Sequence, residues 1–289
     1  MINDWLSNAY EGMSRRQFLA RISAMGVGLT GFATASSSLA GELITTPTAG
    51  ITVADGKVLS GDFPIPIYEA HPSADGKYPI LIVIPEIFGM HEHIKDVARR
   101  FAKEGFLSIT FEPYAREGGV LNLPDIPSVR KVADSVPDKR VMSDLDAIVS
   151  YAVQHKAGHA DRIGVTGFCR GGMYTLLYAA HNHALNAAVA WYGQLRPDKT
   201  RGVRTAGPLD IATHINCPIL GLYGGDDVGI PVSDIREIET ILKEAGKTAE
   251  FVIYPGAPHA FFADYRPSYR PDAARDAWRR CVTWFLKYL

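Results

Sequence analysis

The sequence has only three cysteines among its 289 residues, and they are widely spaced. Three such residues do not make a disulfide framework, and no cluster of Cys and His has the spacing of a metal site. The formal net charge is −1, so the chain lacks the basic surplus that is typical of nucleic-acid binding. It also lacks the G-x-x-x-x-G-K-[ST] phosphate loop. The sequence therefore gives no indication of a metal, a cofactor or a nucleic-acid partner.

Long hydrophobic runs are also missing, since the apolar stretch at 22–35 is too short and weak for a comfortable membrane span. It follows SRRQFL at 14–19 and precedes SLA at 38–40, which offers small residues for signal cleavage. This order is typical of a twin-arginine signal peptide, and the alternative is an amphipathic N-terminal helix of a cytoplasmic protein. We expect residues 1–40 to engage the twin-arginine export machinery. The mature protein would then be periplasmic or secreted and begin near Gly41.

The remaining residues, 41–289, have the pattern of one α/β domain. Hydrophobic residues make up 47% and charged residues 21% of the chain, which is typical of a soluble globular protein. Short apolar runs alternate with helical stretches, which predicts a mainly parallel sheet covered by helices on both faces. The Pro-rich stretch 123–137 is expected to form a binding rim or a plain surface loop. Strands are predicted at 63–69, 79–84, 106–110, 162–167, 187–191, 219–224 and 251–254, and helices at 91–104, 138–155, 170–180, 233–245 and 272–289.

The segment GFCRGG at 167–172 lies between an apolar strand and a buried helix. A nucleophile at the centre of G-x-[nucleophile]-x-G in this setting is the nucleophile elbow of α/β-hydrolases. Here the central residue is Cys169, and Gly167 and Gly171 suit a strained turn that leaves no room for Cβ atoms. A helix that begins at the sulfur lowers the thiol pKa and favours the thiolate. The alternative is a buried structural cysteine in a Gly-rich turn.

An acid and a base follow the elbow in the order that this fold uses, which is nucleophile, acid, histidine. The apolar strand 219–223 ends in Gly-Gly-Asp-Asp, so Asp227 or Asp226 lies where α/β sheets place their ligands. His259 follows the next strand, 251–254, on the loop where the base of this fold belongs. The sequence therefore indicates a Cys-Asp-His catalytic triad, while one of the two aspartates is expected to be an ordinary turn residue.

These motifs identify a family. From about Lys57 to Leu289 the chain resembles the dienelactone hydrolases, also called carboxymethylenebutenolidases. The motifs that carry the resemblance are PEIFG at 85–89, PYAR at 113–116, the GFCRGG elbow, GGDD at 224–227 and PHAF at 258–261. The resemblance implies an α/β-hydrolase fold and hydrolysis of an ester or lactone, with Cys169, Asp227 and His259 as the triad.

The resemblance also implies roles for residues around the triad. Glu86 matches an active-site glutamate that tunes the resting thiol, although from the sequence it could equally stabilise a turn. Arg116 matches an arginine that binds a substrate carboxylate, and the alternative is a solvated loop arginine. The elbow and the loop after the third strand supply oxyanion donors in this fold, which points to the backbone N–H groups of Arg170 and Ile87.

One position departs from the family pattern. The second carboxylate-binding arginine of the family lies four residues after the catalytic histidine, where this chain has Ala263. Arg266 lies three residues further on, and the sequence does not say whether it compensates. We therefore expect a cofactor-free hydrolase of small esters or lactones. The alternatives are a broader esterase for substrates without a carboxylate and a non-catalytic, thiol-bearing binding protein.

Overall fold

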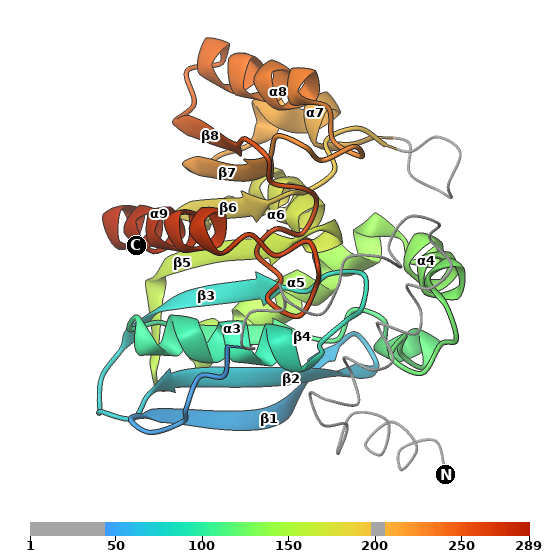
Figure 1. Cartoon of the computed structure of the whole chain (residues 1–289). Coiled ribbons are helices and arrows are strands. Elements are labelled where there is room, and N and C mark those ends of the chain that lie inside the picture. Colours follow the sequence, from blue (N-terminus) through green and yellow to red (C-terminus); the bar gives the residue numbers. More distant parts are fainter. Residues whose placement is uncertain (1–43, 198–205) are drawn as a thin grey trace.

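The computed structural model describes residues 44–197 and 206–289 and has the predicted α/β-hydrolase architecture (Figure 1). Within these residues eight strands form one sheet in the order β1-β2-β4-β3-β5-β6-β7-β8. The first two strands form an antiparallel hairpin, β2 pairs antiparallel with β4, and all later pairs are parallel. The strands are β1 (Ile51–Ser60), β2 (Phe63–Pro72), β3 (Tyr78–Ile84), β4 (Leu107–Phe111), β5 (Gly158–Phe168), β6 (Ala187–Trp191), β7 (Ile219–Gly224) and β8 (Ala249–Tyr254).

Helices cover both faces of the sheet, as predicted. In Figure 1, α3 and α9 lie in front of the sheet and α5 and α6 lie behind it, while α8 packs on the edge strand β8. The long helices are α3 (Glu92–Lys103), α5 (Asp138–Gln154), α6 (Arg170–His181), α8 (Val232–Glu244) and α9 (Pro271–Tyr288). The shorter elements are η1 (Ala115–Glu117), α4 (Ile126–Ser135), α7 (Pro208–Ile211) and η2 (Ala212–His214).

The central strands form the core because both faces of the sheet are covered. Residues 80–84 of β3 are at most 1% exposed, and every residue of β4, β6 and β7 is buried. Strands buried on both faces read as continuous apolar runs rather than alternating ones. Because β3, β5, β7 and β8 run parallel, their carboxyl ends meet at one edge of the sheet, and the loops that follow them carry the candidate site.

Besides the short elements η1, α7 and η2, two longer elements differ from the prediction. The edge strand β1 was not predicted, because most of its residues are exposed and its apolar alternation is weak. The stretch 123–137 was predicted to form a binding rim or a plain surface loop, and the plain loop is wrong because the stretch contains α4. Asp125 caps that helix by accepting a hydrogen bond from the Ser128 N–H at 2.8 Å, and Pro127 fits the first turn, where no N–H donor is needed.

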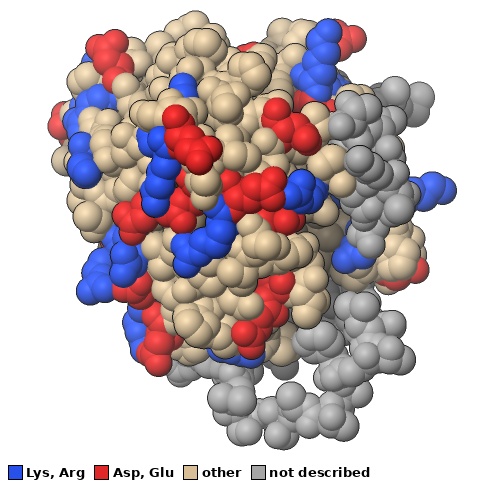
Figure 2. Space-filling model, turned by 90° about the horizontal axis from the view of Figure 1, so that it is seen from above, with Lys and Arg blue, Asp and Glu red and all other residues tan. Residues whose placement is uncertain are grey.

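The distribution of charged side chains on the surface is consistent with the formal net charge of −1. Figure 2 shows acidic and basic side chains interspersed on the viewed face rather than gathered by sign. None of the helices in 44–197 and 206–289 has the length and apolar character needed to cross a membrane. The predicted signal peptide, residues 1–40, lies outside the described part of the chain.

Candidate active site

Cys169 lies in a strained turn between β5 and α6. Its backbone has φ 56° and ψ −114°, a conformation that costs energy for any residue with a side chain. The turn is tight, because a Cβ atom added at Gly167 would lie 2.3 Å from the Gly171 carbonyl oxygen. A Cβ at Gly171 would lie 2.2 Å from the carbonyl oxygen of Ile84, at the end of β3. Glycine at these two positions is what allows the elbow to form.

His259 and Asp227 form the second part of the site. The Nδ1 atom of His259 lies 2.6 Å from Oδ2 of Asp227. The Asp227 side chain is 1% exposed, and its other oxygen accepts the Gly229 N–H at 2.9 Å. The neighbouring Asp226 is exposed and accepts only a longer bond, 3.3 Å, from the Gly256 N–H. The structure thus assigns Asp227 to the histidine and Asp226 to the turn.

The Cys169 thiol pairs with the imidazole of His259. Burial raises the pKa of Cys169, but the charge of His259 and its hydrogen bond to the sulfur outweigh burial and lower that pKa. Burial lowers the pKa of His259, while the charge of Cys169 and the hydrogen bond to Asp227 raise it to about 10. These opposite shifts favour a thiolate–imidazolium pair. The His259 side chain remains 37% exposed, so a substrate can reach it.

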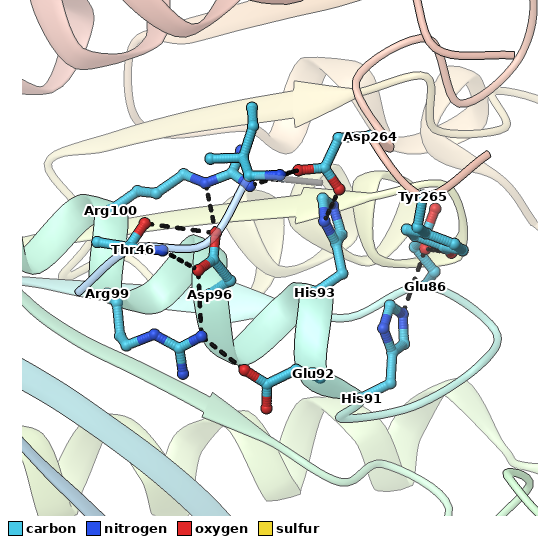
Figure 3. Close-up of polar contacts among 11 residues, drawn as sticks. Thr46, Glu86, His91, Glu92, His93, Asp96, Arg99, Arg100, Asp264 and Tyr265 are labelled. Atoms are coloured by element: carbon cyan, nitrogen blue, oxygen red, sulfur yellow. Dashed lines mark hydrogen bonds and ion pairs between the residues drawn. The ribbon is translucent and has the colours of Figure 1, made fainter. Parts of the chain in front are cut away.

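Glu86 is a buried carboxylate in the turn after β3, and its residue is 1% exposed. The hydroxyl of Tyr265 donates to its Oε2 atom at 2.5 Å, and Nε2 of His91 lies 3.4 Å from the same oxygen (Figure 3). Burial raises the pKa of Glu86, but the hydrogen bond from His91 and the charge of Arg266 lower it to about 2. Glu86 is therefore an anion in the resting site.

The two predicted oxyanion donors lie on neighbouring segments. The close approach of Gly171 to Ile84 brings the first turn of α6 against the end of β3, which precedes the Glu86-Ile87 turn. Across the described residues, no hydrogen-bond acceptor occupies the backbone N–H of Ile87 or of Arg170. Both donors are thus available for a ligand.

The structure places Arg116, the expected carboxylate-binding residue, in a set of contacts with α5, β1 and β2. Its Nη1 atom donates to both carboxylate oxygens of Asp144, at 3.0 and 2.8 Å, and its Nη2 donates to the Ser60 carbonyl at 3.0 Å. The guanidinium also stacks over the Phe63 ring at 4.8 Å. An acid on α5 thus occupies Nη1 and a backbone carbonyl of β1 occupies Nη2, so Arg116 ties η1 to α5 and β1.

Arg266 is the arginine that the structure brings to the active site. Its charge acts on Glu86 and on Cys169, and its half-buried guanidinium lies over the Phe88 ring at 5.3 Å. In the ranges 44–197 and 206–289, neither an ion pair nor a hydrogen bond occupies that guanidinium. The position of Ala263, by contrast, is fully buried.

Three further residues of the site were not predicted from the sequence. Tyr265 and His91 contact Glu86, and the Tyr192 ring meets the His259 ring edge-on at 5.2 Å. Tyr192 has φ 38°, and its buried hydroxyl has no hydrogen-bond partner in the described part of the chain. The sequence indicates these residues only weakly. Tyr192 directly follows β6, at the same sheet edge, and His91 follows the PEIFG motif.

Other cysteines and histidines lie outside this site. Cys217 and Cys281 are buried, and burial raises the pKa of Cys217 to about 12. A cavity of about 830 Å³ lies between α5, α6 and η2, away from the triad. His181 lines this cavity, and its Nε2 atom lies 2.8 Å from Oδ2 of Asp146. No three His, Cys, Asp or Glu side chains gather as metal ligands in the part of the chain that the structure describes.

The comparisons with known proteins agree on one family. A family model described as "Dienelactone hydrolase family" matches residues 65–289. The chain is 46% identical over 278 residues to a protein of Methylorubrum extorquens named "Putative carboxymethylenebutenolidase", covering 96% of this chain and 94% of that one. A protein of the same name from Escherichia coli is 46% identical over 261 residues, covering 90% and 96% of the two chains. A crystal structure from Klebsiella pneumoniae, titled "Putative Dienelactone Hydrolase", is 46% identical with a TM-score of 0.78, covering 82% of this chain and 99% of that one.

Proposed function

The chain belongs to the dienelactone hydrolase family, and we propose that it cleaves an ester or lactone bond with Cys169 as the nucleophile. The observation that carries this proposal is the sequence of contacts from the Cys169 thiol to His259 and from His259 to Asp227, the last at 2.6 Å. A nucleophile on a strained elbow, a base beside it and an acid that orients the base make up the machinery of acyl transfer. A binding protein has no need of all three.

In the first half of the reaction, the Cys169 thiolate attacks the carbonyl carbon and the carbonyl π electrons move to oxygen. When this tetrahedral intermediate collapses, the bond to the leaving oxygen breaks and His259 gives that oxygen its proton. The product is a thioester on Cys169. If the substrate is a lactone, the released hydroxyl stays attached to the acyl group.

In the second half, His259 takes a proton from water, and the resulting hydroxide adds to the thioester carbonyl. Collapse of this second intermediate releases the carboxylic acid and returns the thiolate to Cys169. Asp227 keeps Nδ1 of His259 occupied through both halves, so that the other ring nitrogen faces the reacting atoms.

The backbone N–H groups of Ile87 and Arg170 are proposed to bind the oxyanion in both intermediates. The support for this role is that both donors lack an acceptor within the described chain and that their segments are packed together. Donors that are fixed in advance stabilise the negative charge without reorganisation. Arg170 also begins α6, whose positive dipole end adds to the effect.

We propose further that the substrate carries an anionic group that binds Arg266. A half-buried guanidinium without an ion-pair partner, close to the nucleophile, is suited to bidentate binding of a carboxylate. Arg116 is less suited to this role, because its Nη1 atom donates to Asp144 and its Nη2 atom donates to the Ser60 carbonyl. Arg266 thus supplies the positive charge that is missing at Ala263.

The experiment is a comparison of purified protein on carboxylated lactones and on neutral aryl esters of similar size. We expect hydrolysis of both classes, with higher kcat/KM on the carboxylated lactones. Turnover of neutral esters alone would favour the broader esterase, and no turnover of either class would overturn the proposed hydrolase function.

A further inference from the structure

The loop after His259 contacts Glu86, the second carboxylate of the site, through the side chain of Tyr265. The Tyr265 hydroxyl donates to Glu86 at 2.5 Å, and His91 approaches the same oxygen from the start of α3 (Figure 3). We propose that Tyr265 is a positioning residue: its hydroxyl keeps the Glu86 carboxylate against His91 and Arg266 and so leaves the Cys169 thiol to pair with His259. This inference rests on the proposed function, because it concerns the nucleophile of that reaction.

Glu86 and His259 have opposite effects on the protonation of the Cys169 thiol. The imidazole stabilises the thiolate by charge and by a hydrogen bond, whereas the nearby Glu86 anion raises the pKa of Cys169. A carboxylate that turned toward the sulfur would accept the thiol hydrogen and hold the nucleophile in its neutral form. Glu86 is 1% exposed, and among the described residues no hydrogen-bond donor contacts its Oε1 atom. The Tyr265 hydroxyl fixes the orientation of the Glu86 carboxylate and therefore determines whether that carboxylate can turn toward the sulfur.

Tyr265 is itself held in place by aromatic contacts. Its ring meets the His91 ring at 5.3 Å and the His93 ring at 5.0 Å, and the Arg266 guanidinium lies 5.9 Å from its centre. These contacts involve the ring and not the hydroxyl. Removing the hydroxyl alone is thus expected to leave the packing of the loop intact.

The residue before Tyr265 anchors the loop to α3 and to the start of the described chain. The Asp264 carboxylate is buried and accepts hydrogen bonds from Arg100 at 2.8 Å and from the Ile44 backbone N–H at 3.1 Å. Its other oxygen lies 3.0 Å from Nδ1 of His93. Figure 3 shows this row of contacts beside the Tyr265–Glu86 pair. The loop is therefore fixed at a charged anchor one residue from the hydroxyl that binds Glu86.

The charged and titratable groups that interact with Cys169 come from several elements. The loop after β8 contributes His259, Tyr265 and Arg266, and the loop after β3 contributes Glu86. The hydroxyls of Tyr192 and Tyr114 also interact with the sulfur, and burial raises the pKa of both well above the ordinary value, so they stay neutral. Glu86 is thus the anion whose position sets the thiol, and it is additionally faced by His91 and His93. Burial lowers the pKa of His91 to about 4, so that ring is neutral as well.

The test is Tyr265→Phe, with Tyr269→Phe as the matched control in the same loop. Tyr269 is half-buried, and its hydroxyl makes no hydrogen bond within the described residues. The rate of Cys169 alkylation by iodoacetamide is measured against pH, with the modified residue identified by mass spectrometry. Cys217 and Cys281 are buried with raised pKa values and stay unreactive at neutral pH. Near-UV circular dichroism confirms that each variant is folded.

We expect Tyr265→Phe to move the alkylation midpoint upward by roughly one pH unit, because Glu86 then competes for the thiol proton. In ester hydrolysis the same change is expected to lower kcat about tenfold with little change in KM. Tyr269→Phe is expected to match the unmodified protein in both measurements. An unchanged or lowered midpoint in Tyr265→Phe would overturn the proposal.

A double-mutant cycle shows whether Tyr265 acts through Glu86. In the Glu86→Gln background there is no carboxylate charge to position, so Tyr265→Phe should leave the alkylation midpoint where Glu86→Gln alone puts it. A full upward shift in that background would overturn the proposal. Alkylation needs no substrate, so a failure of the hydrolase proposal and a failure of this one are read separately.

Discussion

His259 and Asp227 are 32 residues apart in the chain, and their side chains lie 2.6 Å apart. The cause is the parallel pairing of β7 and β8, which places Gly224 opposite Tyr254 and lets both loops leave the sheet at the same edge. Because Nδ1 of His259 is held by the carboxylate, the ring presents Nε2 to Cys169 in a fixed orientation. This one contact links the topology of the sheet to the chemistry of the thiol.

Asp227→Asn is expected to lower kcat by roughly 10²- to 10⁴-fold with the fold retained, because the amide no longer orients the imidazole or stabilises its positive charge. Steady-state kinetics with an aryl ester measure the effect. Asp226→Asn is the matched control, since its exposed carboxylate contacts only the Gly256 N–H. Equal losses in the two variants would contradict the assignment of Asp227 as the orienting acid.

The pH dependence of kcat/KM follows from the opposite shifts of the thiol and the imidazole. The active form is the thiolate with a protonated His259, so kcat/KM rises with pH through the lowered pKa of Cys169. It falls again as His259 loses its proton, near pH 10, since burial is outweighed there by the Cys169 charge and by Asp227. We expect a bell-shaped profile with an acid limb below the ordinary thiol range. A profile that falls near the ordinary histidine pKa would contradict the ion pair.

Arg266→Ala is expected to lower kcat/KM for carboxylated lactones by roughly 10- to 150-fold relative to neutral esters, since a charge-assisted hydrogen bond contributes about 1.5–3 kcal/mol. The comparison of the two substrate classes cancels any effect that Arg266 has on the thiol itself. Equal losses for both classes would mean that Arg266 acts on the thiol and not on the substrate.

Arg116→Ala is the control variant for the comparison of the two substrate classes. It leaves the buried Asp144 carboxylate with Ser60 as its remaining hydrogen-bond donor, so we expect a loss of about 1–3 kcal/mol in unfolding free energy. The ratio of kcat/KM between the substrate classes should not change. Thermal unfolding and the two kinetic assays check both expectations.

Export is a separate prediction that rests on the sequence. With both Arg15 and Arg16 replaced by Lys, we expect the precursor to remain in the cytoplasm, because the twin-arginine pair is the feature that the export machinery reads. Cell fractionation and mass spectrometry of the N-terminus measure this. The unaltered protein should be recovered outside the cytoplasm with an N-terminus near Gly41. Recovery of soluble cytoplasmic protein that begins at Met1 would contradict the signal peptide.

The sequence predicted those parts of the fold that depend on local pattern. Buried strands such as β6 and β7 are continuous apolar runs, and the strained elbow requires glycine at fixed offsets from Cys169, so both were recognisable. The exposed edge strand β1 and the helix α4 were missed, because their stability comes from pairing and capping rather than from a strong apolar period.

The site was predictable only where chain order carries information. Motif order predicted Cys169 and His259 but left Asp226 and Asp227 open, and only the resemblance to the family pointed to Asp227. The contact between Tyr265 and Glu86 joins residues 179 positions apart, and no local spacing encodes it. The ion pair of Arg116 with Asp144 is a second such contact: it joins residues 28 positions apart, and the motif that contains Arg116 does not encode it.

The most direct test of the central claim is kcat/KM for ester or lactone hydrolysis by Cys169→Ala, measured beside Cys217→Ala. Removing the nucleophile of a covalent mechanism removes most of the rate, so we expect a loss of at least about 10³-fold in Cys169→Ala with an unchanged circular dichroism spectrum. Cys217→Ala should retain activity, because that thiol is buried in the core. Hydrolysis by Cys169→Ala within about tenfold of the unmodified protein would contradict the account.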